Sequence, residues 1–169
     1  MKHFLEAGKI ASTHGIQGEI RADVWCNSPE FLSTFKQLYL DGGQRVLTVR
    51  QARPHKSQVL FVFDEIKTLE QAIALKNSTL YIYRDDVHLE PGEYFFVDLL
   101  GLRVIGSADG RLFGTVCDIS RTGANDVYHI KTPEDKVVLI PAIPDVIDRV
   151  DLDEDILYIT PISGLFEDI

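Results

Sequence analysis

Short runs of strand-forming residues, each separated from the next by a turn signal, constrain the fold of this chain more than any other feature. Leu38–Leu40, Arg45–Ala52 and Val59–Phe63 are such runs, and Asp41–Gly43 and Pro54–Lys56 interrupt them. Strands at regular spacing with turn residues between them indicate a β-barrel or a β-sandwich. The predicted fold class is therefore all-β, with two or three short helices among the strands.

Three segments have helical signals. Ser28 before Pro29 is suited to cap a short helix. The stretch Thr68–Gln71 has the capping-box pattern, and the apolar residues after it predict a helix to about Lys76. Further on, the spacing within Val146–Val150 predicts one more helical turn.

A hairpin with a long polar loop is predicted over Phe113–Lys131. Two short strand-forming runs flank Arg121–Asp126, whose Gly, Asn and Asp residues favour turns. About six residues are more than a minimal hairpin needs, and long loops on rigid strands often carry binding residues. A solvated turn and a binding loop both fit this pattern.

Charge divides the chain into two parts. Residues 1–89 hold 11 Lys and Arg against 10 Asp and Glu, whereas residues 90–169 hold 6 against 16, a net charge of −10. The charged Arg84–Glu93 stretch ends in Pro-Gly-Glu and predicts the boundary, with domains at 1–84 and 94–169 and a linker at 85–93. The acidic half suits a basic protein partner, or its charge serves solubility alone.

The linker leads into three consecutive aromatic residues, Tyr94, Phe95 and Phe96. Side chains alternate along a strand, so the three rings cannot all enter one core. At least one ring is expected to face the other domain or a partner.

Catalytic and metal-binding signatures are missing from the sequence. It contains no GxxxxGK[ST], GxGxxG or GxSxG motif, and its five histidines, His14 and His129 among them, form no helical ligand pair. We therefore predict no enzyme activity, no catalytic residue, no metal and no cofactor. Cys26 and Cys117 are isolated, which favours a reducing, cytoplasmic location.

Cations gather in the first half of the chain, where phosphate contacts would need them. Arg45 and Arg53 lie eight residues apart, so one regular strand would place both on the same face. Scattered surface cations are the alternative. The candidates for a surface facing RNA or a ribosomal subunit are Lys9, His14, Gly15, Gly18, Arg21, Arg45, Arg53 and Lys56.

An ordered set of short motifs resembles the RimM family of ribosome maturation factors over essentially the whole chain. The matching segments are Gly8-Lys9-Ile10, His14-Gly15-Ile16-x-Gly18-Glu19-Ile20, Tyr94-x-x-x-Asp98-Leu99-x-Gly101, Gly114-x-Val116, Thr122–Asp126, Leu139-Ile140-Pro141 and Gly164-Leu165. The family often has Tyr-Tyr where this chain has Tyr94-Phe95, so only ring packing can be carried over to Phe95.

The resemblance implies a six-stranded barrel like those of translation proteins, followed by a PRC barrel. It also implies a non-catalytic monomer that binds the immature small (30S) ribosomal subunit with its 16S ribosomal RNA, contacts the basic ribosomal protein S-nineteen and assists assembly of the subunit head. The candidate partner-protein residues are Tyr94, Phe95, Arg121, Thr122, Gly123, Asn125 and Asp126. Alternatives are a small-molecule enzyme with an interdomain pocket and a PRC-barrel adaptor without a ribosomal role.

Overall fold

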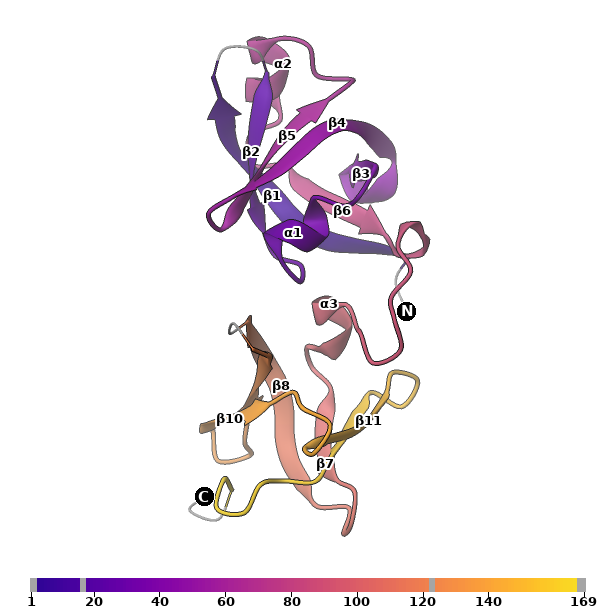
Figure 1. Cartoon of the computed structure of the whole chain (residues 1–169), viewed down its shortest axis with the longest axis vertical. Coiled ribbons are helices and arrows are strands. Elements are labelled where there is room, and N and C mark those ends of the chain that lie inside the picture. Colours follow the sequence, from indigo (N-terminus) through magenta and orange to yellow (C-terminus); the bar gives the residue numbers. More distant parts are fainter. Residues whose placement is uncertain (1–2, 16–17, 122–123, 167–169) are drawn as a thin grey trace. The chain divides into compact units, whose positions relative to one another are not determined.

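The computed structural model describes residues 3–15, 18–121 and 124–166, and it divides into two compact units, Met1–Val97 and Asp98–Ile169. Both units are built mainly of strands (Figure 1), which confirms the all-β fold class. The first unit retains residues 94–97, which the sequence assigned to the second domain. The rest of this account treats each unit separately.

The first unit is a closed barrel with strand order β1-β2-β5-β4-β3-β6. Its strands are β1 (Phe4–His14), β2 (Glu19–Val24), β3 (Gln37–Leu40), β4 (Arg45–His55), β5 (Gln58–Phe63) and β6 (Thr79–Tyr83), and all paired neighbours are antiparallel. Alternating residues point inward, as a barrel requires. Its largest fully buried side chains include Phe61 and Phe63, whose rings stack at 5.1 Å.

Short helices lie between the strands of the first unit. Helix α1 (Pro29–Leu32) begins at Ser28, whose hydroxyl accepts a hydrogen bond from the Phe31 N–H. Helix α2 (Leu69–Ala74) has the predicted capping box, with Thr68 and Gln71 each bonded to the other's backbone N–H. Two 3-10 turns, η1 (Asp41–Gly43) and η2 (Arg84–Asp86), follow β3 and β6, and α3 (Phe96–Leu99) spans the division between the units.

The second unit is a six-stranded sheet with strand order β10-β9-β8-β7-β12-β11. Its strands are β7 (Arg103–Gly106), β8 (Leu112–Arg121), β9 (Asp126–Lys131), β10 (Val137–Pro141), β11 (Ile147–Asp151) and β12 (Ile156–Ile159). Only the β12–β7 pair is parallel. The predicted hairpin is β8 with β9, whereas the predicted helical turn at Val146–Val150 is wrong because β11 occupies it.

Candidate protein-binding and nucleic-acid-binding surfaces

His14 and Arg21 meet across the first hairpin of the barrel. Pairing of β1 with β2 places Ser12 opposite Arg21 and His14 opposite Glu19. The Arg21 guanidinium donates to His14 Nδ1 at 3.0 Å, which places the proton of the neutral imidazole on Nε2. Arg21 Nε is buried and has no hydrogen-bond partner within the described residues. Part of the guanidinium is therefore oriented by His14, while one of its donors is left unpaired.

The loop joining these strands contains Gly15 and Gly18. Both have positive φ, and a Cβ on Gly18 would lie 3.2 Å from the Thr68 carbonyl oxygen at the start of α2. Gly18 thus permits close packing of the loop on α2, whereas Gly15 lies in open space. Neither glycine supplies a functional side chain, so any ligand contact there would use the backbone.

The outer face of β2, β5 and β4 brings two of the predicted arginines into one row. Arg21 pairs with Leu60, and Leu60 pairs with Arg53. Leu60 is only 1% exposed, although it points away from the core cluster that contains Val59 and Phe61. The long stems of the flanking arginines are suited to cover an outward-facing leucine in this way.

Arg45 does not join that row, which corrects the predicted shared face with Arg53. Leu47, Val49 and Ala52 all contact the core, and the register between β4 and β5 shifts between Val49 and Gln51. The extra residue of this bulge reverses which side chains point outward. Arg45 also lies at the opposite end of β4, paired with Leu40. The remaining predicted cations are separate as well, with Lys9 opposite Asp23 and Lys56 in the β4–β5 turn.

A cavity of about 670 Å³ opens beside the Arg53 end of this row. Two ion pairs border it, Arg50 with Asp64 at 2.7 Å and Arg53 with Glu19 at 3.3 Å. Sequence reasoning missed most of its residues because they come from four separate segments. The lining consists of Glu19, Arg50, Gln51, Arg53, Val62, Ile66 and Lys67.

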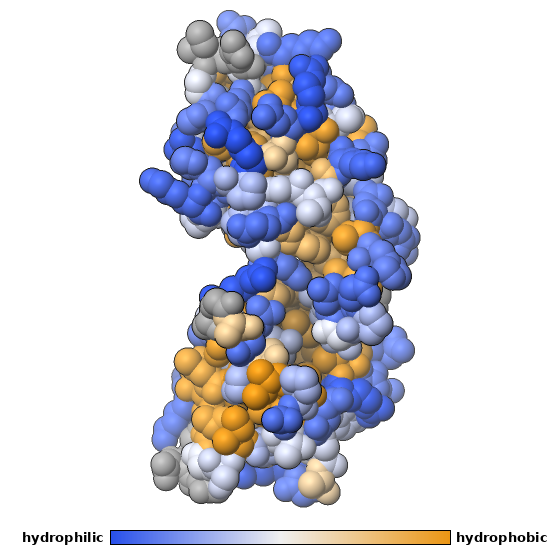
Figure 2. Space-filling view, viewed as in Figure 1, coloured by the Kyte–Doolittle hydropathy of each residue, from blue (hydrophilic) through white to orange (hydrophobic). Residues whose placement is uncertain are grey.

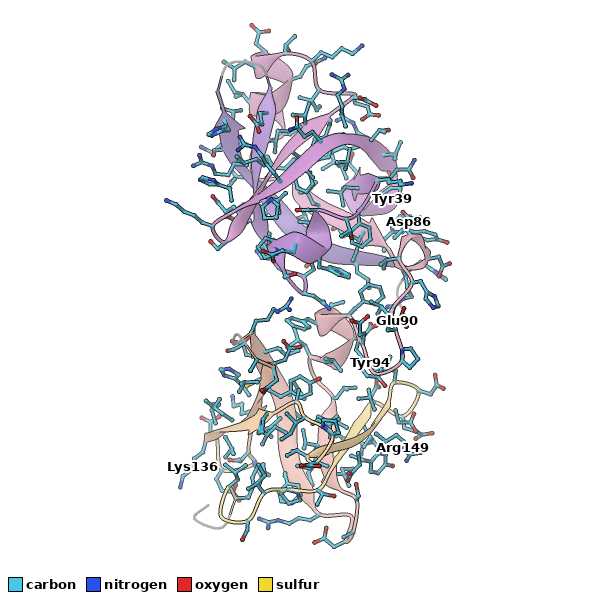
Figure 3. All side chains as sticks on the ribbon, viewed as in Figure 1. Tyr39, Asp86, Glu90, Tyr94, Lys136 and Arg149 are labelled. Atoms are coloured by element: carbon cyan, nitrogen blue, oxygen red, sulfur yellow. The ribbon has the colours of Figure 1, made fainter. Side chains whose placement is uncertain are left out.

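The three aromatic residues after the linker have different environments (Figure 3). Tyr94 is half-buried, whereas Phe95 is 5% exposed and belongs to the core cluster of the first unit. The Asn27 side chain donates to the Tyr94 carbonyl oxygen and accepts from the Phe96 N–H, both at 3.0 Å. A buried ring adds no area to an exposed surface, so Phe95 is assigned to packing and Tyr94 remains a partner-surface candidate.

The β8–β9 loop is braced by its own polar groups. Arg121 pairs with Asp126 in the sheet register, with Nε and Oδ1 3.8 Å apart. The Asn125 amide donates to the Asp126 carbonyl oxygen at 3.1 Å. Thr122 and Gly123, also predicted here, lie outside the described residues. Tyr94 belongs to the first unit and this loop to the second.

Next to the loop lies an apolar strand at the edge of the second sheet. Val137 and Leu139 on β10 are 56% and 50% exposed, and Pro141 pairs with Val127 immediately after Asp126. Figure 2 shows hydrophobic residues gathered where Figure 1 places β10. An exposed edge strand with apolar side chains is a frequent site of pairing with another chain.

Ser120 and His129 form the nearest approach to a catalytic pair. Their Oγ and Nε2 atoms lie 2.6 Å apart. Within the described part of the chain, no carboxylate bonds to His129 Nδ1, and neither Ser120 nor His129 lines the cavity beside Arg53. The orienting third group of a nucleophilic triad is thus missing from this arrangement.

Metal and membrane signatures were also searched over the described residues. No group of three or more His, Cys, Asp or Glu side chains is arranged to hold a metal ion. None of the helices in the same residues has the length and apolar character to cross a membrane.

These features define a class of protein with two consecutive β domains, whose distinctive groups lie on surfaces and loops. The RimM N-terminal domain matches residues 5–87, and the RimM PRC barrel domain matches residues 96–165. The chain belongs to the RimM family of ribosome maturation factors, as the ordered motifs predicted.

Relatives with this name match over nearly their whole length. The ribosome maturation factor RimM of Clostridioides difficile is 35% identical, covering 99% of this chain and 98% of the relative. That of Exiguobacterium sp. is 37% identical, with 98% of each covered. A crystal structure of a RimM protein from Pseudomonas aeruginosa is 25% identical, with a TM-score of 0.47 and coverage of 92% and 96%.

Proposed function

We propose that this chain is a non-catalytic ribosome maturation factor that binds the immature 30S subunit, contacts ribosomal protein S-nineteen through its second unit and assists assembly of the subunit head. The observation that carries the proposal is membership of the RimM family across both units. In this proposal the protein acts as a monomer in the cytoplasm, and its first unit faces 16S ribosomal RNA.

The charge of the second unit supports a basic protein as its partner. Residues 98–169 hold 6 Lys and Arg against 14 Asp and Glu, a net charge of −8. Complementary potentials raise the rate at which two proteins meet and disfavour partners of like charge. Such a surface repels RNA phosphates and attracts a basic ribosomal protein.

The apolar edge strand supplies the contact area that charge alone does not. Lys136 and Thr132 share a backbone hydrogen bond, so alternation along the ladder leaves the N–H and C=O groups of Val137 and Leu139 directed away from β9. Exposed side chains and outward backbone groups thus occur in the same two residues. A segment of S-nineteen lying along β10, close to the β8–β9 loop, would use both.

Binding of purified S-nineteen to full-length protein tests this surface directly. Leu139→Asn should weaken affinity at least 10-fold, because it replaces a central apolar contact with an amide. Leu112→Asn is the matched control, since Leu112 is equally exposed but lies at the opposite end of β8 from Arg121. Equal affinity of the two variants for S-nineteen would remove β10 from the proposed surface.

Gradient sedimentation of cell extract tests the wider role. The wild-type chain should migrate with free small subunits at low salt, and Tyr94→Ala should reduce that fraction while Trp25 fluorescence of the folded protein is kept. Absence of the wild-type chain from the small-subunit fractions would contradict the ribosomal role itself.

A further inference from the structure

The cavity on the first barrel has the composition of a phosphate site. Three of its lining side chains are cationic, Arg50 and Arg53 from β4 and Lys67 from the β5–α2 connection, against the single carboxylate of Glu19. Arginine and lysine are the side chains that bind phosphate oxygens most strongly, arginine through paired N–H donors. These residues approach one hollow from different parts of the chain, which scattered surface cations would not do.

The existing ion pairs leave these cations available to a ligand. The Arg50 side chain is 63% exposed in its pair with Asp64, and Arg53 is 52% exposed in its pair with Glu19. Exposed pairs of this kind contribute about 1 kcal/mol or less, so a phosphate can displace or share them. Lys67 has no carboxylate within ion-pair distance in the ranges that the structure describes.

The cavity also offers contacts for more than a bare phosphate. Val62 and Ile66 supply an apolar floor, and Gln51 supplies an amide that can donate and accept. A volume of about 670 Å³ falls within the range of small-ligand sites. None of the lining residues is aromatic, so the site has no stacking platform for reading base identity.

The row Arg21–Leu60–Arg53 extends positive charge from the cavity toward the His14 loop. Arg21 and Arg53 are two strand spacings apart, about 10 Å, and lie on the same outer face. Arg21 Nε remains an unpaired donor along this path. A flexible nucleic-acid strand could therefore place one phosphate at the cavity and a neighbouring one near Arg21.

We infer that this cavity binds a phosphate ester of single-stranded RNA, with one nucleotide over Val62 and Ile66 and its phosphate held by Arg50, Arg53 and Lys67. The inference rests on the proposed function, since it specifies how the first unit faces RNA. The contacts are to backbone and ribose, so binding is independent of sequence and sensitive to salt.

Anisotropy of a labelled 12-nucleotide oligouridylate with the full chain tests this assignment. Arg50→Gln combined with Lys67→Gln should lower affinity about 10-fold and reduce the slope of log affinity against log salt by about 1.4, as loss of two phosphate contacts predicts. Lys36→Gln combined with Arg45→Gln removes the same charge outside the cavity and should change affinity less than 3-fold. Equal losses in the two double variants would overturn the inference, because binding would then follow overall charge.

Competition distinguishes the sources of the phosphate. Uridine monophosphate and inorganic phosphate should displace the labelled RNA only at concentrations far above that of unlabelled oligouridylate. Displacement by the mononucleotide at the oligonucleotide's own concentration would overturn RNA as the ligand and make the cavity a nucleotide site. Loss of RNA binding with co-migration of the variant on small subunits would refute the cavity's role while leaving the proposed function standing.

Discussion

The rings of Phe31 and Phe95 pack edge to face with their centroids 6.1 Å apart. This contact joins α1 to a segment that follows the last strand of the barrel, and the Arg84 guanidinium lies 5.3 Å from the Phe95 ring centroid. The Asn27 side chain bonds to the backbone on both sides of Phe95. The aromatic segment therefore completes the core of the first unit.

Phe95→Ala is expected to destabilise the first unit by about 3 kcal/mol, because it deletes a buried ring and leaves a cavity. Urea unfolding followed by the fluorescence of Trp25, the only tryptophan, reports on this unit. Tyr94→Ala is the control and should cost about 1 kcal/mol or less, since its ring is half-buried. Equal midpoints for the wild type and Phe95→Ala would show that the ring is not needed for the core.

This packing changes how the partner surface should be tested. A double substitution of Tyr94 and Phe95 would combine a change at the surface with a loss of core packing. Weaker partner binding by that variant could then follow from partial unfolding. Tyr94→Ala alone separates the two effects.

The sequence predicts local signals better than it predicts register. Thr68 and Gln71 cap α2 because both partners lie within one turn, so tertiary contacts are not needed to bring them together. The apolar spacing in Val146–Val150 is equally compatible with a short strand, and pairing of β11 with β12 decides the outcome.

Among the candidate site residues, a bulge in β4 separates Arg45 from Arg53, and no local pattern marks that bulge. The Asn27 contacts and the cationic cavity depend on segments distant in sequence. One sequence read residue by residue gives no signal for either of them.

Gly114→Ala should destabilise the second unit by at least about 3 kcal/mol. A Cβ at this position would lie 2.1 Å from the Lys131 carbonyl oxygen, and Gly114 also has a φ of +152°. The backbone of β8 or β9 would have to move, which few contacts can compensate. Gly110→Ala is the matched control in the same hairpin, because it has positive φ but nothing within 4 Å, and it should cost about 1 kcal/mol. Thermal unfolding by circular dichroism would rank the variants, and equal melting temperatures for both would contradict the close approach.

Cys26 and Cys117 should differ in reactivity in the folded protein. Burial raises the pKa of the Cys26 thiol from its usual 9.0 to about 11, whereas Cys117 is exposed. A thiol reagent at pH 8 should therefore label one cysteine per chain quickly and the second only after unfolding in urea. Cys117→Ser should abolish the fast phase, and a fast phase that persists in this variant would place Cys26 at the surface.

The same pKa shift predicts a loss of stability at alkaline pH. The unfolded chain releases the Cys26 proton near pH 9, while the folded chain holds it to about pH 11. Stability from the neutral thiol is thus complete below pH 9 and falls as pH rises toward 11, by about 2 kcal/mol. Unfolding free energies of the wild type and Cys26→Ala should converge over this range. A constant difference between them would contradict the shift.

Asp148 on β11 should contribute acid sensitivity to the second unit. Hydrogen bonds donated by the Ser107 and Thr160 hydroxyls hold the pKa of its carboxylate below the usual 3.8. Because the folded-state pKa is depressed, the stabilisation is present above about pH 4 and is lost as pH falls through the lowered value. The melting temperatures of the wild type and Asp148→Asn should therefore differ at pH 6 and converge below pH 3. Asp153→Asn is the control, since no hydrogen bond from its side chain occurs within the described residues. A difference between Asp148→Asn and the wild type that is the same at pH 6 and below pH 3 would contradict an ionised, doubly bonded Asp148.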